Sequence, residues 1–104
     1  MTFTLTILTP ESKAYSGEVE ALVAPGLEGS FGVLPRHAPM VCALRAGIVK
    51  LQVDGAASFF VIRGGVAEVG PDAVTILTDG ATPAQDPLDA EAKLEKAEEE
   101  ERSG

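Results

Sequence analysis

Two side chains of this sequence have the chemistry of a catalytic pair, a thiol and an imidazole. Cys42 is the only cysteine, and His37, the only histidine, precedes it by five positions. A cysteine becomes a nucleophile when a neighbouring base generates its thiolate, so a minimal hydrolase is one hypothesis for this pair. However, Cys42 lies within the apolar run 40–44, where a small core or interface residue is the commoner role. No third residue that would orient the base can be named, and we therefore expect no catalytic residues.

Metal and cofactor sites have even less support in the sequence. With one histidine and one cysteine, a zinc site would have to rely on carboxylates, and no spacing typical of zinc ligands occurs. Gly26, Gly29 and Gly32 recur at every third position, but the dinucleotide-binding and phosphate-loop patterns are both missing. We therefore predict no metal and no cofactor, and we assign these glycines to turns.

The segment around His37 is typical of a shaped, exposed loop. Residues 29–39 have the sequence GSFGVLPRHAP, in which glycines alternate with short apolar stretches and prolines. Proline fixes φ and removes an amide donor, while glycine adopts backbone angles that other residues avoid. We predict a loop with a specific conformation on which a partner docks. His37 either caps its own turn or faces that partner, and the sequence leaves both possibilities open.

Alternation of apolar and polar residues predicts that most of the remaining chain is β-strand. Residues 2–8 and 19–23 alternate with a period of two, which predicts two half-buried strands paired as a hairpin. Asp54-Gly55 between two runs of strand-forming residues predicts a tight hairpin. Short strands separated by turn residues predict an all-β sandwich or flattened barrel. The further strands are expected at residues 40–44, 48–53, 58–62, 66–69 and 74–77.

The last part of the sequence changes from a strand pattern to a helix pattern. Asp86 is a typical N-cap and Pro87 a typical first helical residue, while Arg102 would lie near the negative end of the helix dipole. We predict one short helix from about Pro87 to Arg102. Its only large apolar side chains are Leu88 and Leu94, so we expect the helix to fray or to rest weakly on the sandwich.

Charge divides the chain into a β-sandwich domain at residues 1–85 and a short acidic helix at residues 86–104. The second part has eight acidic and three basic side chains, so it carries −5 of the net charge of −8. This balance argues against binding to nucleic acid or to anionic lipid. No apolar stretch approaches the roughly 20 residues of a membrane span. The single cysteine and the lack of a leader-like segment predict a soluble, reducing compartment without import.

Several segments together resemble the epsilon subunit of F-type ATP synthases. They are residues 28–39, Gly47 at the next turn, GGVAEV at 64–69 and VTILTD at 74–79. Their order and spacing agree with the family from about residue 2 to residue 85. Val66 stands where the family commonly has a bulkier residue, and Arg36 stands where it usually has glycine. Arg36 would restrict the turn to φ below zero or add a charge that faces the partner.

The resemblance implies a non-catalytic subunit of a rotating central stalk. Similar subunits form a sandwich of about ten strands that couples the gamma subunit to the membrane c-ring of a proton-translocating ATP synthase. By matching position, the residues expected at the gamma interface are Thr9, His37 and Cys42. The loop expected to face the c-ring contains Glu28, Ser30, Phe31 and Arg36.

The partners implied by the resemblance are the gamma subunit, the c-ring and the remaining subunits of the complex. Nucleic acid is not among them, and membrane contact occurs only through the complex. The implied location is peripheral, at the cytoplasmic face of a bacterial inner membrane. Family members generally carry two helices after the sandwich that can block ATP hydrolysis. This sequence shows about one helix and no ATP-binding motif, which argues against intrinsic inhibition.

One alternative of a different class stays open at this point. A free-standing small β-sandwich that binds a ligand or a peptide would also use a shaped loop, as the rim of its site. Nothing in the sequence beyond residues 29–39 supports this alternative.

Overall fold

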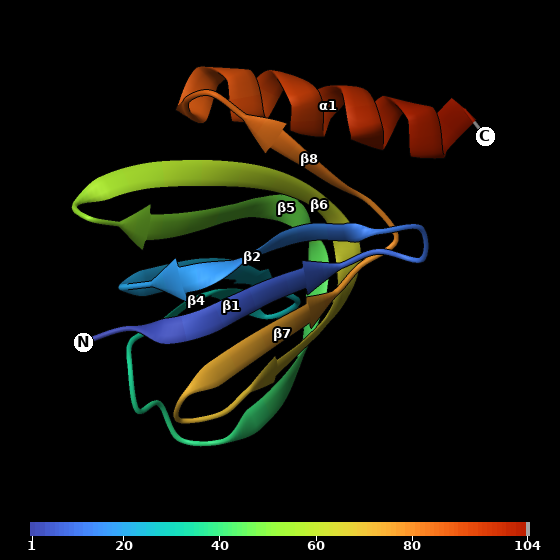
Figure 1. Ribbon diagram of the computed structural model, residues 1–104. Coiled ribbons are helices and arrows are strands. Elements are labelled where there is room, and N and C mark those ends of the chain that lie inside the picture. The colour runs from blue at the N-terminus through green and yellow to red at the C-terminus, as the bar shows by residue number, and fades with distance from the viewer. Residues whose placement is uncertain (104) are drawn as a thin grey trace.

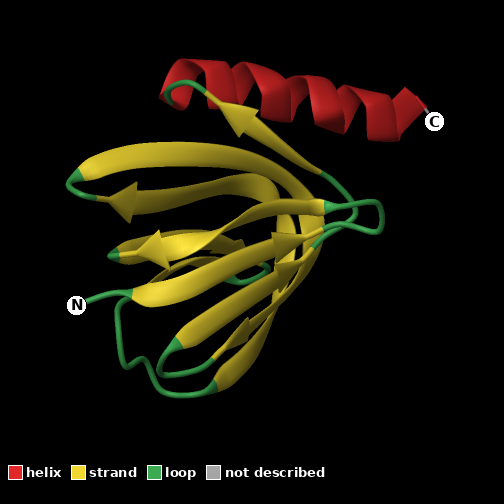
Figure 2. Ribbon diagram, in the orientation of Figure 1, coloured by secondary structure: helices red, strands yellow, loops and turns green. Residues whose placement is uncertain are grey.

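The strands form two layers of a sandwich, and one helix lies against an outer face (Figures 1 and 2). The computed structural model describes residues 1–103, with side chains described through residue 100. The elements in chain order are β1 (Phe3–Leu8), β2 (Lys13–Val19), β3 (Ala21–Gly26), β4 (Gly29–Val33), β5 (Met40–Val53), β6 (Ala56–Val69), β7 (Ala73–Leu77), β8 (Ala81–Ala84) and α1 (Pro87–Ser103).

A single sheet supplies both layers because two of its strands are long and bent. The strand order is β2-β1-β7-β6-β5-β3-β4, with β8 added to β6. The pair β1 and β7 is parallel, and the other pairs are antiparallel. The first part of β5 and the last part of β6 lie in the layer of β1, β2 and β7, and their other halves lie with β3, β4 and β8 (Figure 1).

The expected count of about ten strands is wrong, because residues 45–47 and 63–65 bend two strands without ending them. Pairing of β5 with β6 continues through this region as Ala46↔Arg63 and Gly47↔Ile62. Gly64 and Gly65 have φ values of +83° and +129°, which let β6 turn from one layer to the other. The sandwich prediction is confirmed with eight strands, and the sheet is open, with β2 and β4 at its two edges.

The predicted hairpin of residues 2–8 with residues 19–23 is also wrong. The antiparallel partner of β1 is β2, whereas β3 lies in the other layer and pairs with β4 and β5. The chain changes layers at Glu20. The buried residues Val19 and Leu22 are three positions apart, so the alternation of buried residues shifts by one position at this boundary. The predicted loop at residues 29–39 is partly wrong too, because residues 29–33 form β4 and only residues 34–39 form a loop.

The Asp54-Gly55 turn between β5 and β6 is confirmed. Both residues have positive φ, +51° and +78°, as a tight hairpin of this kind requires. The amide of Gly55 donates a hydrogen bond of 2.9 Å to the Glu20 carboxylate. This bond ties the tip of the long hairpin to the crossing between the layers.

Aliphatic side chains fill the space between the layers. In β1 the buried residues alternate with half-buried threonines, as a strand with one face on the core requires. Burial of one such aliphatic side chain contributes about 1.5–3 kcal/mol. The largest fully buried side chains are Phe3, Leu5, Ile7, Leu22, Leu51, Ile62 and Ile76.

Helix α1 begins as the sequence predicts. The amide of Asp89 donates a hydrogen bond of 2.8 Å to the carboxylate of Asp86, the N-cap. The carboxylate of Asp89 accepts a bond from the Gln85 amide and lies 3.0 Å from Lys93 Nζ, and both interactions hold its pKa below the ordinary value. The predicted effect of Arg102 on the helix end lies outside the described side chains.

Small and polar groups hold α1 on the sandwich. Ala90 is fully buried, Lys93 Nζ donates a 2.9 Å bond to the Pro83 carbonyl, and Arg63 forms a 3.0 Å ion pair with Glu100. Surface ion pairs of this kind contribute little, about 0–1 kcal/mol. Helix α1 is not long and apolar enough to cross a membrane, and it is the only helix in the described range.

Gly65 provides a test of the bend in β6. A Cβ at this position would overlap the Leu77 carbonyl oxygen, whereas at Gly29, with a similar φ of +140°, no atom lies within 4 Å. Gly29→Ala therefore measures backbone strain alone, about 1–3 kcal/mol. In Gly65→Ala the new methyl group would also clash with the Leu77 backbone. We therefore expect this variant to lower the free energy of unfolding by about 1–3 kcal/mol more than Gly29→Ala does. Urea unfolding followed by circular dichroism measures both, and equal losses would contradict the role of Gly65.

Candidate functional site

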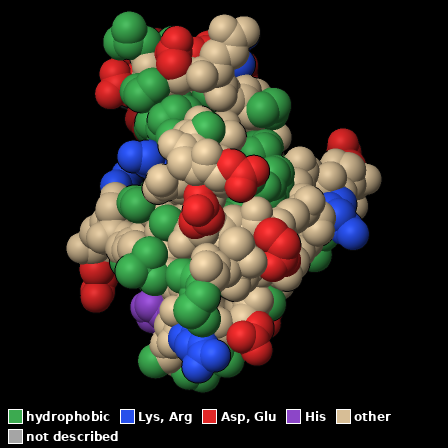
Figure 3. All heavy atoms as spheres, turned by 60° about the vertical axis from the view of Figure 1, so that its left-hand side comes forward, with side chains coloured by type: hydrophobic (Ala, Val, Ile, Leu, Met, Phe, Trp, Pro, Cys, Tyr) green, Lys and Arg blue, Asp and Glu red, His purple; other side chains and the backbone are tan. Residues whose placement is uncertain are grey.

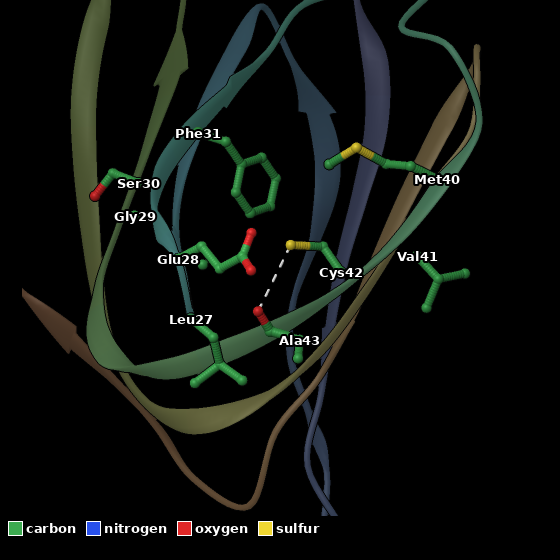
Figure 4. Close-up of a pocket in the computed structure, with 10 residues that line it drawn as sticks. Leu27, Glu28, Gly29, Ser30, Phe31, Met40, Val41, Cys42 and Ala43 are labelled. Carbon is green, nitrogen blue, oxygen red and sulfur yellow. Dashed lines mark hydrogen bonds between the residues drawn. The ribbon is translucent and has the colours of Figure 1, made fainter.

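A hollow lies between the β3–β4 hairpin and the start of β5 (Figure 4). Its volume is about 490 Å³, and its walls come from residues 26–31 and 40–43. In Figure 4 the ring of Phe31, the carboxylate of Glu28 and the thiol of Cys42 point into it, while Val41 and Ser30 point away. Three residues expected from the sequence to face the c-ring, Glu28, Ser30 and Phe31, therefore lie together.

Close packing of backbone fixes the walls of this hollow. A Cβ on Gly47 would lie 2.6 Å from the Cβ of Pro25, so β3 and β5 approach closely only because residue 47 has no side chain. The ring of Phe31 lies over Gly26, where a Cβ would come within 3.1 Å of it. The Leu27 amide donates a 3.0 Å bond to the Ala43 carbonyl. The hollow is thus a shaped surface formed before any partner binds.

The hollow contains a thiol but no base for it. Cys42 is half-buried, and its Sγ lies 3.5 Å from the carbonyl oxygen of Ala43. His37 is not among the lining residues. Among the described residues, the only other ionisable side chain that lines the hollow is that of Glu28. The arrangement gives no support to the hydrolase hypothesis.

His37 makes a contact within its own turn. Its Nδ1 lies 2.7 Å from the carbonyl oxygen of Ala38, so the ring donates this bond in the tautomer that carries hydrogen on Nδ1. Of the two possibilities left by the sequence, this contact favours the capping role. Figure 3 shows the histidine on the surface, next to a basic side chain and among hydrophobic ones.

Arg36 adopts a backbone conformation that the sequence did not predict. Its φ is +66°, so the expectation that arginine restricts this turn to negative φ is wrong. The Arg36 amide donates a 2.8 Å bond to the Pro71 carbonyl, which joins the loop to the turn between β6 and β7. Tertiary hydrogen bonding therefore overrides the local preference, and the side chain remains exposed.

Thr9 lies elsewhere, at the turn between β1 and β2. Its hydroxyl accepts a 3.1 Å bond from the Ser12 amide, and it borders a separate hollow with Gly65, Leu77 and Asp79. The three residues expected at the gamma interface thus do not share one surface. Cys42 lies in the large hollow, His37 in the loop after β4, and Thr9 at the end of β1.

An exposed row of apolar side chains crosses the outer face of the first layer. We call Leu8, Ala43, Val66 and Leu77 the apolar row, because they are neighbours in register on β1, β5, β6 and β7. Val66 and Leu77 are 37% and 41% exposed, and Val41, two residues before Ala43, is 75% exposed. Contiguous exposed apolar side chains commonly mark a protein interface. The sequence signal for this row is that its residues are apolar, although they occupy strand positions where alternation predicts polar side chains.

The remaining chemistry of the described residues is sparse. No group of three or more His, Cys, Asp or Glu side chains gathers in a way that could hold a metal ion within the described range. The Glu18 carboxylate accepts bonds from the hydroxyls of Thr4 and Thr2, which hold its pKa below the ordinary value. These contacts stabilise the β1–β2 pair and form no pocket.

Comparison with protein families gives one match that covers most of the chain. Residues 2–84 match the model of the family described as "ATP synthase, Delta/Epsilon chain, beta-sandwich domain". The chain is 44% identical over 97 residues to the ATP synthase epsilon chain of Pelotomaculum thermopropionicum, covering 91% of this chain and 72% of the relative. It is 45% identical over 89 residues to that of Rhodopseudomonas palustris strain BisA53, covering 86% and 65%. The chain thus spans about two thirds of the length of these relatives.

Solved structures of similar fold come from ATP synthases. A chain in the OSCP/F1/c-ring structure of the Euglena gracilis mitochondrial enzyme matches with a TM-score of 0.77 and 32% identity, covering 98% of this chain and 64% of that one. A chain from the central stalk and c-ring of the Tetrahymena thermophila enzyme matches with a TM-score of 0.66, covering 93% and 90%. At 16% identity, the second match shows the fold alone.

Arg36 allows a test of the strained loop. Since its φ is +66°, Arg36→Gly should raise the free energy of unfolding, by up to about 1 kcal/mol. Arg36→Ala removes the same charge but keeps the strain, and it should leave stability nearly unchanged. Urea unfolding of the two variants separates these effects. An equal change in both would show that charge, and not backbone conformation, determines the stability of this turn.

Proposed function

The chain belongs to the family of ATP synthase delta/epsilon chains, and we propose that it is a non-catalytic subunit of the central stalk. In this role it couples the gamma subunit to the c-ring of a proton-translocating F-type ATP synthase. The observation that carries the proposal is the match of the sandwich, residues 2–84, to the family domain. Relatives named ATP synthase epsilon chain support it, as does the likeness to a chain in a structure that contains F1 and the c-ring.

The apolar row supports the presence of a protein partner on the first layer. Thr9 follows Leu8 of this row directly, so a partner that covers Leu77 and Val66 also reaches Thr9. We assign this partner as the gamma subunit, with Thr9, His37 and Cys42 at or near the interface. We assign the contact of Cys42 with this partner to the face of β5 that borders the hollow, because the Cys42 side chain points opposite to that of its neighbour Ala43.

The β3–β4 hairpin and the loop after β4 supply the surface that we assign to the c-ring. Glu28 and Ser30 are exposed at the hairpin, Phe31 anchors its wall, and Arg36 is exposed in the loop. Loops of the c-ring are usually basic in this family. Attraction between these basic loops and Glu28 then guides how the c-ring approaches and aligns with the chain more than it raises the affinity. This attraction weakens as the salt concentration increases.

A stiff sandwich suits a part that transmits torque. The walls of the hollow and the bend of β6 depend on tight backbone contacts at Gly47 and Gly65, so these surfaces do not have to be ordered on docking. We further propose that the chain is peripheral, on the cytoplasmic face of a bacterial inner membrane, and contacts the membrane only through the complex.

Leu77 and Val23 form a matched pair of variants for the gamma interface. Both are strand residues 41% exposed, but Leu77 belongs to the apolar row and Val23 lies on the outer face of the other layer. We expect Leu77→Asp to lower affinity for purified gamma subunit at least about tenfold, equivalent to 1.4 kcal/mol, because a carboxylate would be desolvated at the interface. Val23→Asp should change the affinity for gamma subunit by less than about twofold.

Isothermal titration calorimetry at one salt concentration gives both affinities. Thermal unfolding of each variant alone serves as the control for folding. Equal affinities of the two variants would rule out the apolar row as the gamma interface. A larger loss for Val23→Asp would move the interface to the second layer.

Helix α1 gives a separate test of inhibition. Ala90 and the Arg63–Glu100 pair hold the helix against the sandwich, and we propose that it stays there in the complex. Deletion of residues 87–104 should leave the rate of ATP hydrolysis by the reconstituted complex unchanged, although the domain itself loses some stability. A clear rise in that rate would show that the helix inhibits hydrolysis.

A further inference from the structure

Strand β4 leaves one of its edges without a partner. It is the last strand of the sheet and pairs only with β3 in the described part of the chain. Along this strand Gly29, Ser30 and Gly32 are exposed, while Phe31 and Val33 face the interior side. An unpaired edge presents backbone donors and acceptors that another extended chain can satisfy.

Hairpin geometry identifies the groups that point outward. Gly26 and Gly29 close the two-residue turn between β3 and β4, and the Gly29 carbonyl oxygen lies close to Gly26. Along an antiparallel pair of strands, residue pairs joined by backbone hydrogen bonds alternate with pairs that are not. Because Pro25 has no amide hydrogen to donate, Pro25↔Ser30 is a pair without hydrogen bonds. The N–H and C=O groups of Ser30 and, two residues on, of Gly32 therefore point away from β3.

The two edges of the sheet are protected to different degrees. Strand β2, at the opposite edge, carries Lys13 and Glu18, and charged side chains on an edge discourage pairing with other chains. Strand β4 has the sequence GSFGV, with no charge and no proline. Strand β8, which lies off this order of strands, also pairs on one side only, but it contains Pro83, whose carbonyl accepts a bond from Lys93 of α1. Of these edge strands, β4 is therefore the one open to an added strand.

The hollow beside β4 indicates the side chains of the occupant. Its walls are mainly apolar, with Phe31, Met40 and Leu27 among them, and Glu28 is the only acidic or basic residue that lines it. A segment that pairs with β4 can place alternate apolar side chains into this hollow, and a basic side chain on it would meet the Glu28 carboxylate. The chain's own net charge of −8 disfavours a second copy as the occupant.

We propose that the free edge of β4 binds an extended segment of a partner protein by strand addition. The segment carries apolar side chains at alternate positions and a basic side chain opposite Glu28. This inference rests on the proposed function, because it names how a subunit of the ATP synthase engages this end of the sandwich. The bonds to Ser30 and Gly32 supply the docking geometry, and the hollow supplies selectivity.

Amide hydrogen exchange in the assembled enzyme tests the pairing without any substitution. The chain is added to ATP synthase depleted of its epsilon chain, and exchange of individual amides is compared with that of the isolated chain. Strand addition should slow exchange at Ser30 and Gly32 by at least about tenfold, since exchange then requires the added strand to open. The amide of Ser16 should not change.

Two serines form a matched pair of variants. The amide of Thr4 donates to the Asp72 carbonyl on the β7 side, so Thr6 also faces β7 and its partner Ser16 points its N–H outward from β2. Ser30→Pro and Ser16→Pro thus each remove one outward amide from an edge strand, where proline is tolerated. We expect Ser30→Pro to lower affinity for the depleted enzyme at least about tenfold and Ser16→Pro to have little effect.

Gly32→Pro serves as a second variant should Ser30→Pro fail to fold, as judged by its thermal unfolding. Glu28→Gln tests the charge, and we expect it to reduce the salt dependence of assembly while amide protection persists. A fall in affinity for Ser30→Pro or Gly32→Pro, together with protected amides, would establish the strand addition.

The failures of the two proposals can be told apart. If the unmodified chain assembles but Ser30 and Gly32 exchange as fast as before, or both proline variants assemble normally, the strand addition is wrong and the proposed function stands. If the unmodified chain does not assemble, the proposed function is wrong and this inference is wrong with it. Light scattering that shows a dimer of the isolated chain, lost in Ser30→Pro, would make a second copy the occupant and overturn the proposal.

Discussion

The continuous pairing of β5 with β6 through a sharp bend is the interaction on which the rest of the structure depends. Thirteen residue pairs join these two strands, from Met40↔Val69 to Val53↔Ala56. Because the register is the same before and after the bend, one pair of strands belongs to both layers and positions every other strand. The bend requires residues without side chains at two close approaches, Gly47 against the ring of Pro25 and Gly65 against the backbone of Leu77.

This bend also creates the two surfaces on which the functional account rests. Before the bend, β5 has Cys42 facing the hollow and Ala43 facing outward in the apolar row. Adjacent residues of one strand thus face opposite sides of the first layer. A rigid strand that connects two docking surfaces can transmit force between them without chemistry of its own.

Local sequence patterns predicted those features that local physics determines. The Asp54-Gly55 turn and the Asp86 N-cap follow from backbone and hydrogen-bonding preferences of a few adjacent residues, and both are present. The route between layers did not follow from such patterns. The buried face shifts by one position between Val19 and Leu22, where the chain passes from β2 to β3 without a turn residue, and Gly64-Gly65 bends a strand that glycines more often end.

The candidate site was likewise predictable only where residues adjacent in the sequence form it. Residues 28–31 are neighbours in the sequence, so their placement together at one hollow needed only a hairpin. Thr9, His37 and Cys42 were grouped by resemblance, and tertiary structure places them on separate parts of the surface. The positive φ of Arg36 arises from a hydrogen bond to Pro71, 35 positions away, which no local preference encodes.

The measurement that tests the central claim most directly is co-elution of the unmodified chain with purified gamma subunit on a sizing column, at low and at moderate salt. The account predicts a stoichiometric complex at both salt concentrations, because the apolar row supplies contacts that salt does not screen. Separate elution of the two proteins under both conditions would contradict a place in the central stalk and would leave a free-standing peptide-binding sandwich as the better account.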